Sequence, residues 1–432
     1  MSTEAAAAIV FTGLFVCLAI GIPIAFTLIL VGMVGIWLVS DWSTVWGMAQ
    51  VVPFSTVSNP ALVAIPLYLA MGYIISTGGV AEDIYIALSR WVGRLPGGLM
   101  QATIGGCAVF GAASGSSMAC AAAFGRVSVP EMIKFGYDRK MTLGGIGAAA
   151  NLAMIIPPSV AMILYGILTE KSIIMLFIAG IIPGVIEAAS YMMLVGIRAM
   201  INPKLAPRSP VFPWRERFSS LRRIWPIVVL GVAILGSIYG GVATITEAAA
   251  VGGVAALLIT LFHRKVPLRG LREPFWDTLR TSAMLFMILL GAALFTFFLT
   301  LTGFPASLAA YISSLDLAGW QVMFFLLLIY VLLGCIIDGA SMLILTIPIV
   351  FPMITALHYD PIWFGIFVVK AIELGQLTPP LGLNCYVIAG SVPGVKLEEV
   401  FAGVLPYLLL NVAMTIVLIF FPIIATWLPS TM

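Results

Sequence analysis

Two short segments place oxygen-bearing side chains inside apolar stretches of the chain. The first is Ser114-Gly115-Ser116-Ser117 and the second is Asp338-Gly339-Ala340-Ser341. They interrupt the stretches 99–124 and 320–358, several of whose halves are too short to cross a bilayer as helix. Non-helical backbone is tolerated at membrane depth only where protein or water satisfies it. We therefore predict two re-entrant helical hairpins with these segments at their tips.

A pair of prolines follows each predicted hairpin, in Pro157-Pro158-Ser159 and in Thr378-Pro379-Pro380. Proline lacks a backbone N–H and clashes with the carbonyl one turn back, so two in succession open a helix and free several carbonyls. Freed carbonyls and serine hydroxyls together form an oxygen cage suited to a small monovalent cation. The half-helix N-termini at the same breaks suit a substrate carboxylate. These features predict broken helices over 141–168 and 362–390.

Close helix packing is the alternative explanation for any single Gly/Ser segment. Three motifs, however, recur in the same order at offsets of 222 to 224 residues. They are the two tips, the two proline pairs, and Ala179-Gly180-Ile181-Ile182-Pro183 with Ala402-Gly403-Val404-Leu405-Pro406. The recurrence indicates an internal duplication, and it favours an ion and substrate site over simple packing.

The composition predicts whether these elements lie in water or in a lipid bilayer. Of 432 residues, 62% are hydrophobic and 9% are charged, whereas roughly a quarter are charged in soluble domains. Apolar stretches of about 20 residues, the length that crosses the hydrocarbon core as helix, recur along the chain. An all-α polytopic membrane protein in the lipid bilayer is therefore expected. The predicted crossings are 8–39, 61–77, 141–168, 172–197, 224–241, 244–262, 281–303, 362–390 and 400–428, the first of them long, with Gly21 and Pro23 as a possible kink.

Other functional classes find little support in the sequence. A net charge of +3, with the basic residues confined to a few loops, argues against nucleic acid as a partner. The five cysteines lie in apolar stretches and form no CxxC motif, which argues against disulfide or metal chemistry. The sequence contains no HExxH motif, no Ser/His/Asp arrangement and no GxxxxGK[ST] loop, so neither catalysis nor direct use of ATP is expected.

Loop charges predict the orientation. The most basic loops are 198–223 and 263–280, and both are expected in the cytoplasm because cytoplasmic loops carry an excess of Lys and Arg. Counting crossings from them places the N-terminus in the cytoplasm and the C-terminus in the periplasm. The same count makes the two hairpins enter from opposite sides. Such inverted-topology repeats are common in secondary transporters.

The predicted organisation has four parts. An N-terminal scaffold helix and loop occupy residues 1–60, and the first repeat occupies 61–197. Basic cytoplasmic loops with a connecting helix pair occupy 198–280, and the second repeat occupies 281–428.

Ionisable residues in or near the predicted spans are weaker candidates, because such groups are functional suspects but also pair structurally. Glu373 is the strongest of them, since it stands five residues before Thr378. Arg126 follows the first hairpin and suits either an anionic substrate or a topology anchor. The other candidates are Glu187, Glu247, Lys370, His263 and His358.

The chain also carries several short motifs whose combination is specific, although each alone is weak. The run Asn151-Leu152-Ala153-Met154 precedes the first proline pair. Besides the first tip, the motifs are Pro130-Glu131-Met132, Gly136-Tyr137-Asp138, Ile155-Ile156-Pro157-Pro158-Ser159, Tyr165-Gly166, Thr246-Glu247-Ala248-Ala249, Trp363-Phe364-Gly365 and Leu377-Thr378-Pro379-Pro380-Leu381-Gly382-Leu383-Asn384.

Together these motifs resemble the large membrane subunit of TRAP transporters, the tripartite ATP-independent periplasmic class, over nearly the whole chain. The run 151–154 departs from the family pattern, which more often has a Gly-containing apolar run there. The resemblance implies elevator-type transport and scaffold domains, sodium as coupling ion and no cofactor. It implies a small four-helix membrane subunit and a periplasmic substrate-binding protein as partners. Family substrates are mostly organic acids: C4-dicarboxylates, sialic acids, other sugar acids, keto acids, and sometimes the zwitterion ectoine.

The resemblance further implies sodium sites at the two hairpin tips, with the substrate beside them. The expected first sodium site is Ser114, Gly115, Ser117, Asn151, Ile155 and Pro157. The expected second sodium site is Asp338, Gly339, Ser341, Gly375, Thr378 and Pro380. The expected substrate contacts are Ser116, Ser117, Pro158, Ser159, Thr378 and Asn384.

The predicted function is sodium-coupled uptake of an organic acid across the bacterial inner membrane. The main alternative is a stand-alone sodium/carboxylate symporter, which would transport without a binding protein. A membrane enzyme would need clustered His, Asp or Cys within the spans, and a channel fits inverted hairpins less well than alternating access does.

Overall fold

The computed structural model describes residues 2–208, 212–262 and 268–432, and every regular element in these ranges is a helix. Within them, eight helical segments are long and apolar enough to cross a membrane. The prediction of an all-α polytopic membrane protein is thereby confirmed. The segments are Pro60–Thr77, Arg139–Thr169, Ile173–Ile201, Trp214–Tyr239, Ile245–Phe262, Arg272–Thr302, Gly339–Ala356 and Leu397–Phe420.

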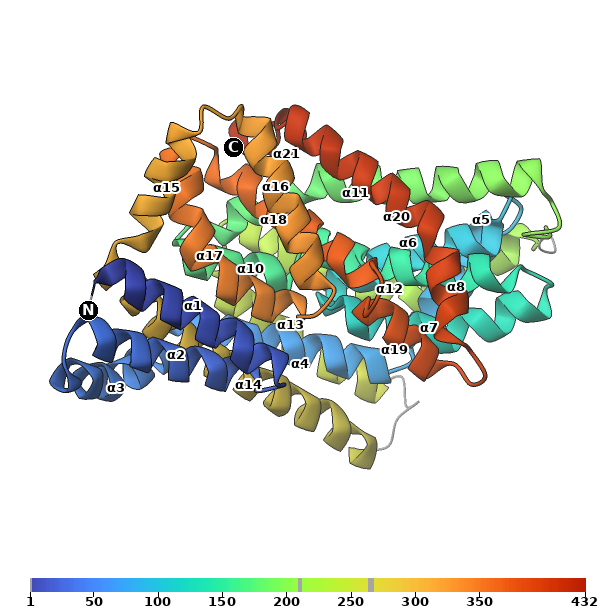
Figure 1. The fold of residues 1–432 in the computed structure, drawn as a ribbon. Coiled ribbons are helices and arrows are strands. Elements are labelled where there is room, and N and C mark those ends of the chain that lie inside the picture. The colour runs from blue at the N-terminus through green and yellow to red at the C-terminus, as the bar shows by residue number, and fades with distance from the viewer. Residues whose placement is uncertain (1, 209–211, 263–267) are drawn as a thin grey trace.

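The N-terminal region differs from the prediction. Instead of one crossing over 8–39, the chain forms α1 (Thr3–Ala19) and α2 (Ile24–Val39), which pack side by side (Figure 1). Gly21 adopts a φ of +84° at the turn between them, a conformation open to glycine without steric cost. The chain therefore reverses direction here. The segment that follows, predicted as loop, forms α3 (Trp42–Val57).

Two units with the same order of helices build the centre of the molecule. In each, a pair of helices is followed by a broken helix and then by a long helix. In the first unit these are α6 (Gly98–Ser114), α7 (Ser117–Lys134), α8 (Arg139–Ala150), α9 (Leu152–Ile155), α10 (Val160–Thr169) and α11 (Ile173–Ile201). In the second unit they are α16 (Gly319–Gly334), α17 (Gly339–Ala356), α18 (Pro361–Leu377), α19 (Leu383–Ser391) and α20 (Leu397–Phe420).

The remaining helices flank these units. Among them, α12 and α14 begin inside the basic segments 198–223 and 263–280, so the loops predicted there are partly helical. Arg and Lys have high helix propensity, which lets a helix continue beyond its apolar part. The flanking helices are η1 (Pro60–Val63), α4 (Ala64–Thr77), α5 (Val80–Val92), α12 (Trp214–Tyr239), α13 (Ile245–Phe262), η2 (Leu268–Leu271), α14 (Arg272–Thr302), α15 (Phe304–Ser314), α21 (Ile423–Thr426) and η3 (Pro429–Thr431).

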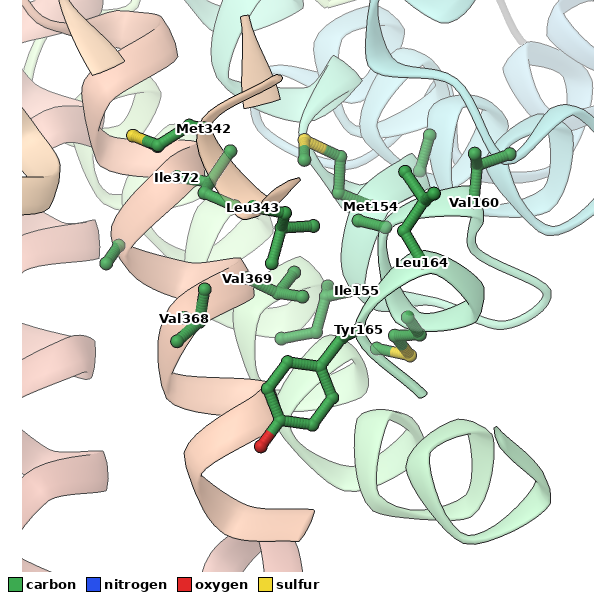
Figure 2. Close-up of a cluster of buried hydrophobic side chains, with 14 of the residues drawn as sticks. Met154, Ile155, Val160, Leu164, Tyr165, Met342, Leu343, Val368, Val369 and Ile372 are labelled. Atoms are coloured by element: carbon green, nitrogen blue, oxygen red, sulfur yellow. The ribbon is translucent and has the colours of Figure 1, made fainter. Parts of the chain in front are cut away.

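The long helix α14 packs along α2 and α4, and α13 packs on α4, so these helices form one group. A second group forms where the two units meet: α8 packs on α20, and α10 packs on α17. Figure 2 shows apolar side chains from both units interlocking around Ile155, Leu343 and Val369, all of which are buried. In a bilayer, where lipid is as apolar as leucine, such close packing is a main source of helix association.

Candidate functional site

The first tip is a tight turn held against the first break. Helix α6 ends at Ser114, Gly115 adopts a φ of +59°, and the Ser116 hydroxyl accepts a hydrogen bond from the backbone N–H of Ala119 at 3.3 Å, which starts α7. A Cβ on Gly115 would stand 3.0 Å from the Pro158 carbonyl oxygen. The predicted juxtaposition of tip and proline pair is thus present in the fold.

The first break is buried. Helix α9 ends at Ile155, and the Ser159 hydroxyl accepts a hydrogen bond from Met162 N–H at 3.5 Å to begin α10. Pro157 and Pro158, joined by a cis peptide bond, lie in the protein interior between these helices.

The second tip is organised by a carboxylate. Asp338 accepts hydrogen bonds from the N–H groups of Ala340 and Ser341, both at 3.1 Å, and from the Ser341 hydroxyl. These contacts begin α17, as an N-terminal cap does. The Cys335 thiol, just before the tip, lies 3.4 Å from the Pro379 carbonyl oxygen. The second tip therefore also meets its own proline pair.

The second break is more open than the first. Pro379 and Pro380 are exposed, and Thr378 is half-buried, with its hydroxyl donating to the Leu374 carbonyl at 2.7 Å. Helix α16 approaches α18 closely here, because a Cβ on Gly375 would lie 2.6 Å from the Gly334 Cα.

The two tips meet at one small cavity of about 90 Å³. The Ser117 hydroxyl of the first tip donates to Gln376 Oε1 of α18 at 3.0 Å, and a Cβ on Gly339 would lie 3.0 Å from Gln376 Nε2. Helices α4 and α14 close the opposite wall of the cavity. The polar residues that line it are Tyr73, Ser116, Ser117, Thr281, Asp338 and Gln376.

Of the expected substrate contacts, Ser116 and Ser117 line this cavity, whereas Pro158, Ser159, Thr378 and Asn384 lie outside its lining. Of the expected sodium residues, Gly115 lies against the Pro158 carbonyl at the first break, and Gly375 lies against Gly334 beside the second tip. Asn151 instead contacts Glu373 and Asn384, and sodium binding at either set stays a prediction. Gln376 was missed by the sequence reasoning. The signal was available, since it is an uncharged polar residue directly before Leu377-Thr378 in an apolar helix.

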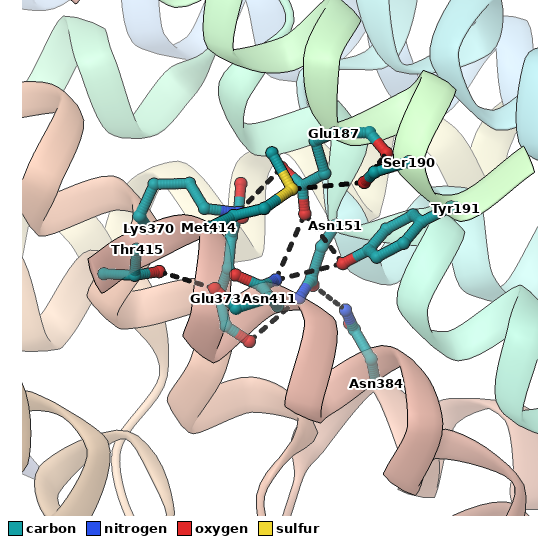
Figure 3. A network of polar contacts seen from close by, with 10 residues as sticks. All are labelled: Asn151, Glu187, Ser190, Tyr191, Lys370, Glu373, Asn384, Asn411, Met414 and Thr415. Atoms are coloured by element: carbon teal, nitrogen blue, oxygen red, sulfur yellow. Dashed lines mark hydrogen bonds and ion pairs between the residues drawn. The ribbon is translucent and has the colours of Figure 1, made fainter. Parts of the chain in front are cut away.

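Asn151 and Asn384 join the two broken helices. The Asn384 amide donates to Asn151 Oδ1 at 2.5 Å, and the Asn151 amide donates to the Glu373 backbone carbonyl at 2.8 Å (Figure 3). Both asparagines are fully buried. The two breaks are thus connected through side chains as well as through apolar packing.

Three of the weaker candidates form a buried charge cluster, which we define as Glu187, Lys370 and Glu373 (Figure 3). The Lys370 Nζ lies 2.7 Å from Glu187 Oε2 and 2.6 Å from Glu373 Oε2. Glu187 also accepts hydrogen bonds from the Tyr191 hydroxyl at 2.7 Å and from the Asn411 amide at 3.1 Å. The cluster does not line the cavity between the tips.

The other weaker candidates lie elsewhere. Glu247 is exposed and accepts hydrogen bonds from Thr244, which starts α13. Arg126 lines a cavity of about 330 Å³ together with residues at the start of α14. His358 follows α17 with a φ of +60°, and His263 lies outside the described residues.

The oxygen atoms at the tips suit a hard cation. Among the described residues, no group of three or more His, Cys, Asp or Glu side chains is arranged to hold a metal ion. Hydroxyls, backbone carbonyls and, at the second tip, one carboxylate are the donors available there. Oxygen donors of this kind suit hard cations rather than thiolate-binding transition metals.

Comparison with known proteins connects this architecture to a family. The sequence profile described as "Tripartite ATP-independent periplasmic transporter, DctM component" matches residues 11–424. The C4-dicarboxylate TRAP transporter large permease protein DctM of Pseudomonas aeruginosa is 34% identical over 87% of this chain and 88% of that protein. The Vibrio cholerae protein of the same name is 31% identical over 98% of both chains. The sialic acid TRAP transporter large permease protein SiaM of Vibrio cholerae is 28% identical over 93% of each.

A solved structure shares the fold at low sequence identity. The MtrF efflux pump of Neisseria gonorrhoeae superposes with a TM-score of 0.59 at 14% identity, covering 85% of this chain and 82% of that one. This likeness concerns the fold alone. The family match and the close relatives confirm a multi-pass membrane transport subunit rather than an enzyme. The chain therefore belongs to the DctM family of TRAP transporter large permeases.

Proposed function

We propose that this chain carries out sodium-coupled secondary uptake of an organic acid as the large subunit of a three-component transporter. The observation that carries the proposal is the cavity lined by both tips, α4 and α14. One substrate there contacts two duplicated tips at once. Because both tips line this cavity, a cation bound at either tip then changes the charge and position of groups that contact the substrate.

The tips supply reasons to choose sodium. Each has a hydroxyl-bearing residue beside a proline pair, where the missing N–H groups leave carbonyl oxygens without helical partners. Asp338 adds a full negative charge at the second tip, directly at the cavity. We infer one sodium ion at each tip, with the substrate bound beside Ser116 and Ser117.

An elevator-type movement fits the division of the helices into two groups. The two units pack on each other through α8, α10, α17 and α20, whereas α2, α4, α13 and α14 pack together beside them. The cavity lies where the groups meet. We infer that the units form the transport domain, that the tips are re-entrant, and that α4 and α14 belong to the scaffold.

The cavity in this structure is proposed to face the cytoplasm. It shares Tyr73, Ser116 and Met118 with the larger cavity of about 330 Å³, which extends to Arg126 and to Asp277 near the start of α14. That end of the molecule carries the basic segments around α12 and α14. Positive residues favour the cytoplasmic side, so the substrate pathway opens inward.

The hairpin of α1 and α2 changes the proposed position of the N-terminus. Since α2 returns the chain toward the end from which α1 started, both chain ends lie away from the basic segments (Figure 1). We therefore place both termini in the periplasm. The earlier count gave the N-terminus to the cytoplasm because it treated 8–39 as one crossing.

The substrate is proposed to be an organic acid delivered by a periplasmic binding protein. The relatives are named for C4-dicarboxylates and for sialic acid. Both of these substrates carry carboxylate groups. Aromatic side chains on α2 and α3 are exposed, among them Trp37, Trp46 and Phe54. They form an apolar surface that suits contact with a small membrane subunit or with lipid. The alternative remains a stand-alone symporter, which differs in needing no partner.

Reconstituted proteoliposomes test this function. The chain is reconstituted with and without a small four-helix TRAP membrane subunit and a periplasmic binding protein from the same organism. Uptake of radiolabelled organic acids is followed under an inward sodium gradient. We expect uptake only with all three components and only with sodium outside. Saturable uptake by the chain alone would favour the stand-alone symporter, and uptake independent of sodium would overturn the coupling.

A further inference from the structure

The cavity of about 330 Å³ beside the first tip, which we call the inner vestibule, has walls of opposite charge. Arg126 lines it from α7, and Glu273 and Asp277 line it from near the start of α14. Tyr73 and Ser116 line both the inner vestibule and the cavity between the tips, so the two cavities adjoin. In the orientation proposed above, a molecule that leaves the tips for the cytoplasm passes between these charges.

One face of α7 connects the first tip with Arg126. Met118, Ala122 and Arg126 follow one another at intervals of four residues, which places them on the same face of the helix. Ala119 and Ala123 line the inner vestibule beside them, and the short alanine side chains leave space along this face. At 1.5 Å per residue, Arg126 stands about 15 Å along the helix axis from the tip. An open path therefore leads from the tip to a single cation.

The Arg126 guanidinium has donors to offer a ligand. The side chain is exposed, and within the described ranges of the chain it makes no hydrogen bond or ion pair. A guanidinium presents five N–H groups in a planar fork that matches a carboxylate. Lys134, at the end of α7, lies outside the lining of the cavity and already occupies the position of a membrane anchor. Arg126 thus has a place in the cavity that anchoring does not require.

The second unit has no counterpart of this cation. At the offset of 224 residues that aligns the two tips, Arg126 corresponds to Val350, and Ala123 corresponds to Ile347. The matching face of α17 therefore carries larger apolar side chains and no charge at these positions. Arg126 is not a by-product of the duplication, and it lies on the side proposed for substrate release.

We propose that the inner vestibule is a second, transient binding site for the carboxylate of the transported organic acid, with Arg126 as its donor. The proposal rests on the proposed function, because it takes the organic acid as substrate and the cytoplasm as its destination. Hydrogen bonds between charged partners are roughly twice as strong as neutral ones, so Arg126 attracts a carboxylate away from the hydroxyls of the tip. Glu273 and Asp277 on the facing wall repel the same carboxylate, which keeps its binding weak and lets it pass on.

Protection of a cysteine placed in the inner vestibule measures this binding without transport. Ala122→Cys is introduced into the full chain in lipid nanodiscs, and the rate of its labelling by a water-soluble thiol reagent is followed. The chain without this substitution gives the background from its native cysteines. The probes are succinate, a C4-dicarboxylate, and N-acetylneuraminate, a sialic acid, both added without sodium because the tips are proposed to need it. At least one of these carboxylates should slow the labelling.

Variants at the charged walls should shift the protection in opposite directions. Arg126→Gln should raise the half-protecting concentration about tenfold or more, because an interaction with a charged group is lost. Arg126→Lys keeps the charge without the fork and should fall between. Asp277→Asn should lower the half-protecting concentration, because it removes a repulsion. The control Lys134→Gln removes a positive charge from the same helix outside the cavity and should change nothing. If Arg126→Gln does not fold, the opposite shifts of Arg126→Lys and Asp277→Asn decide.

Lack of protection by both carboxylates would overturn the proposal, and so would equal protection in the chains with Arg126 and with Arg126→Gln. Inorganic phosphate is a third probe. Protection by phosphate at the same concentration as the carboxylate would assign the inner vestibule to anions in general and would also contradict the proposal. Failure of the proposed function looks different: uptake in proteoliposomes would be independent of sodium, whereas protection that depends on Arg126 would persist.

Discussion

The two tips occupy the same place in their units but differ in burial and in charge. Ser114 and Ser117 are buried, and the first proline pair lies in the interior. Asp338 is half-buried, and the second proline pair is exposed. The first tip therefore offers a cation only neutral oxygens in a dry setting, whereas the second offers a carboxylate at a wetter one. Duplicated geometry thus does not imply duplicated energetics.

The difference continues along the broken helices. At the offset that aligns the proline pairs, Asn151 of the first unit corresponds to Glu373 of the second, and Ala148 corresponds to Lys370. The buried charges therefore lie on the second broken helix, whereas the charged residues of the first, Arg139 and Lys140, are exposed at the start of α8. We expect the second unit to depend more on electrostatics and the first more on packing.

Removing the carboxylate of the second tip should have the largest effect. Asp338→Asn keeps an oxygen that can cap α17 but removes the negative charge at the cavity. Interactions with charged groups contribute about 1.5–3 kcal/mol, so the sodium concentration for half-maximal uptake should rise about tenfold or more. Sodium titration of uptake in the three-component proteoliposomes measures this. Glu247→Gln is the matched control, and an unchanged sodium dependence in Asp338→Asn would show that the carboxylate does not face a cation.

The contact between hairpin and broken helix should tolerate an added methyl group equally poorly in both units. A Cβ on Gly111 would lie 2.7 Å from the Ala153 Cα, and one on Gly334 would lie 2.7 Å from the Gly375 Cα. Overpacking of this kind costs about 1–3 kcal/mol, so Gly111→Ala and Gly334→Ala should lower the thermal unfolding midpoint by similar amounts.

The control for these two variants is Gly236→Ala in α12, where an added Cβ meets no atom within 4 Å. This substitution should leave the unfolding midpoint unchanged or raise it slightly. A clear difference between Gly111→Ala and Gly334→Ala would show that the two hairpins are not packed equivalently on their broken helices.

Single hydroxyl deletions should have the smallest effects and should separate the tips. Ser117→Ala removes the hydrogen bond to Gln376, and Thr378→Ala removes a hydroxyl at the second break. Each is expected to cost about 0.5–1.5 kcal/mol, a shift of a few-fold to tenfold in sodium dependence. Ser117→Ala should also weaken substrate binding, because Ser117, unlike Thr378, lines the cavity. Identical uptake kinetics for the two variants would contradict the prediction that only the first of them weakens substrate binding.

Spacing along the chain was sufficient to predict the tips, the proline breaks and their pairing. The reason is physical: a proline pair disrupts a helix wherever it stands, and small residues in an apolar stretch mark a turn. The reversal at Gly21 was missed because 8–39 is apolar throughout, so hydropathy alone does not separate a long crossing from two short helices. Gly21 and Pro23 indicated a possible kink within this stretch, but a kink and a full reversal before α2 have the same sequence signal.

Contacts between distant residues were beyond the sequence. The Asn384–Asn151–Glu373 chain joins residues more than two hundred positions apart, and no local propensity encodes such a meeting. The sequence placed Glu187, Lys370 and Glu373 in spans but left each as a separate candidate. Only the crossing of α11 and α18 brings them into one cluster. The role of Gln376 likewise depends on where the first tip lies.

The sodium-to-substrate flux ratio tests the central claim, that both unequal tips bind sodium during each cycle. Labelled sodium and labelled substrate are followed together in the three-component proteoliposomes with the membrane potential clamped. Two occupied tips predict at least two sodium ions per substrate. A ratio of one would contradict the claim. Uptake that persists when potassium replaces sodium under an imposed proton gradient would also contradict it.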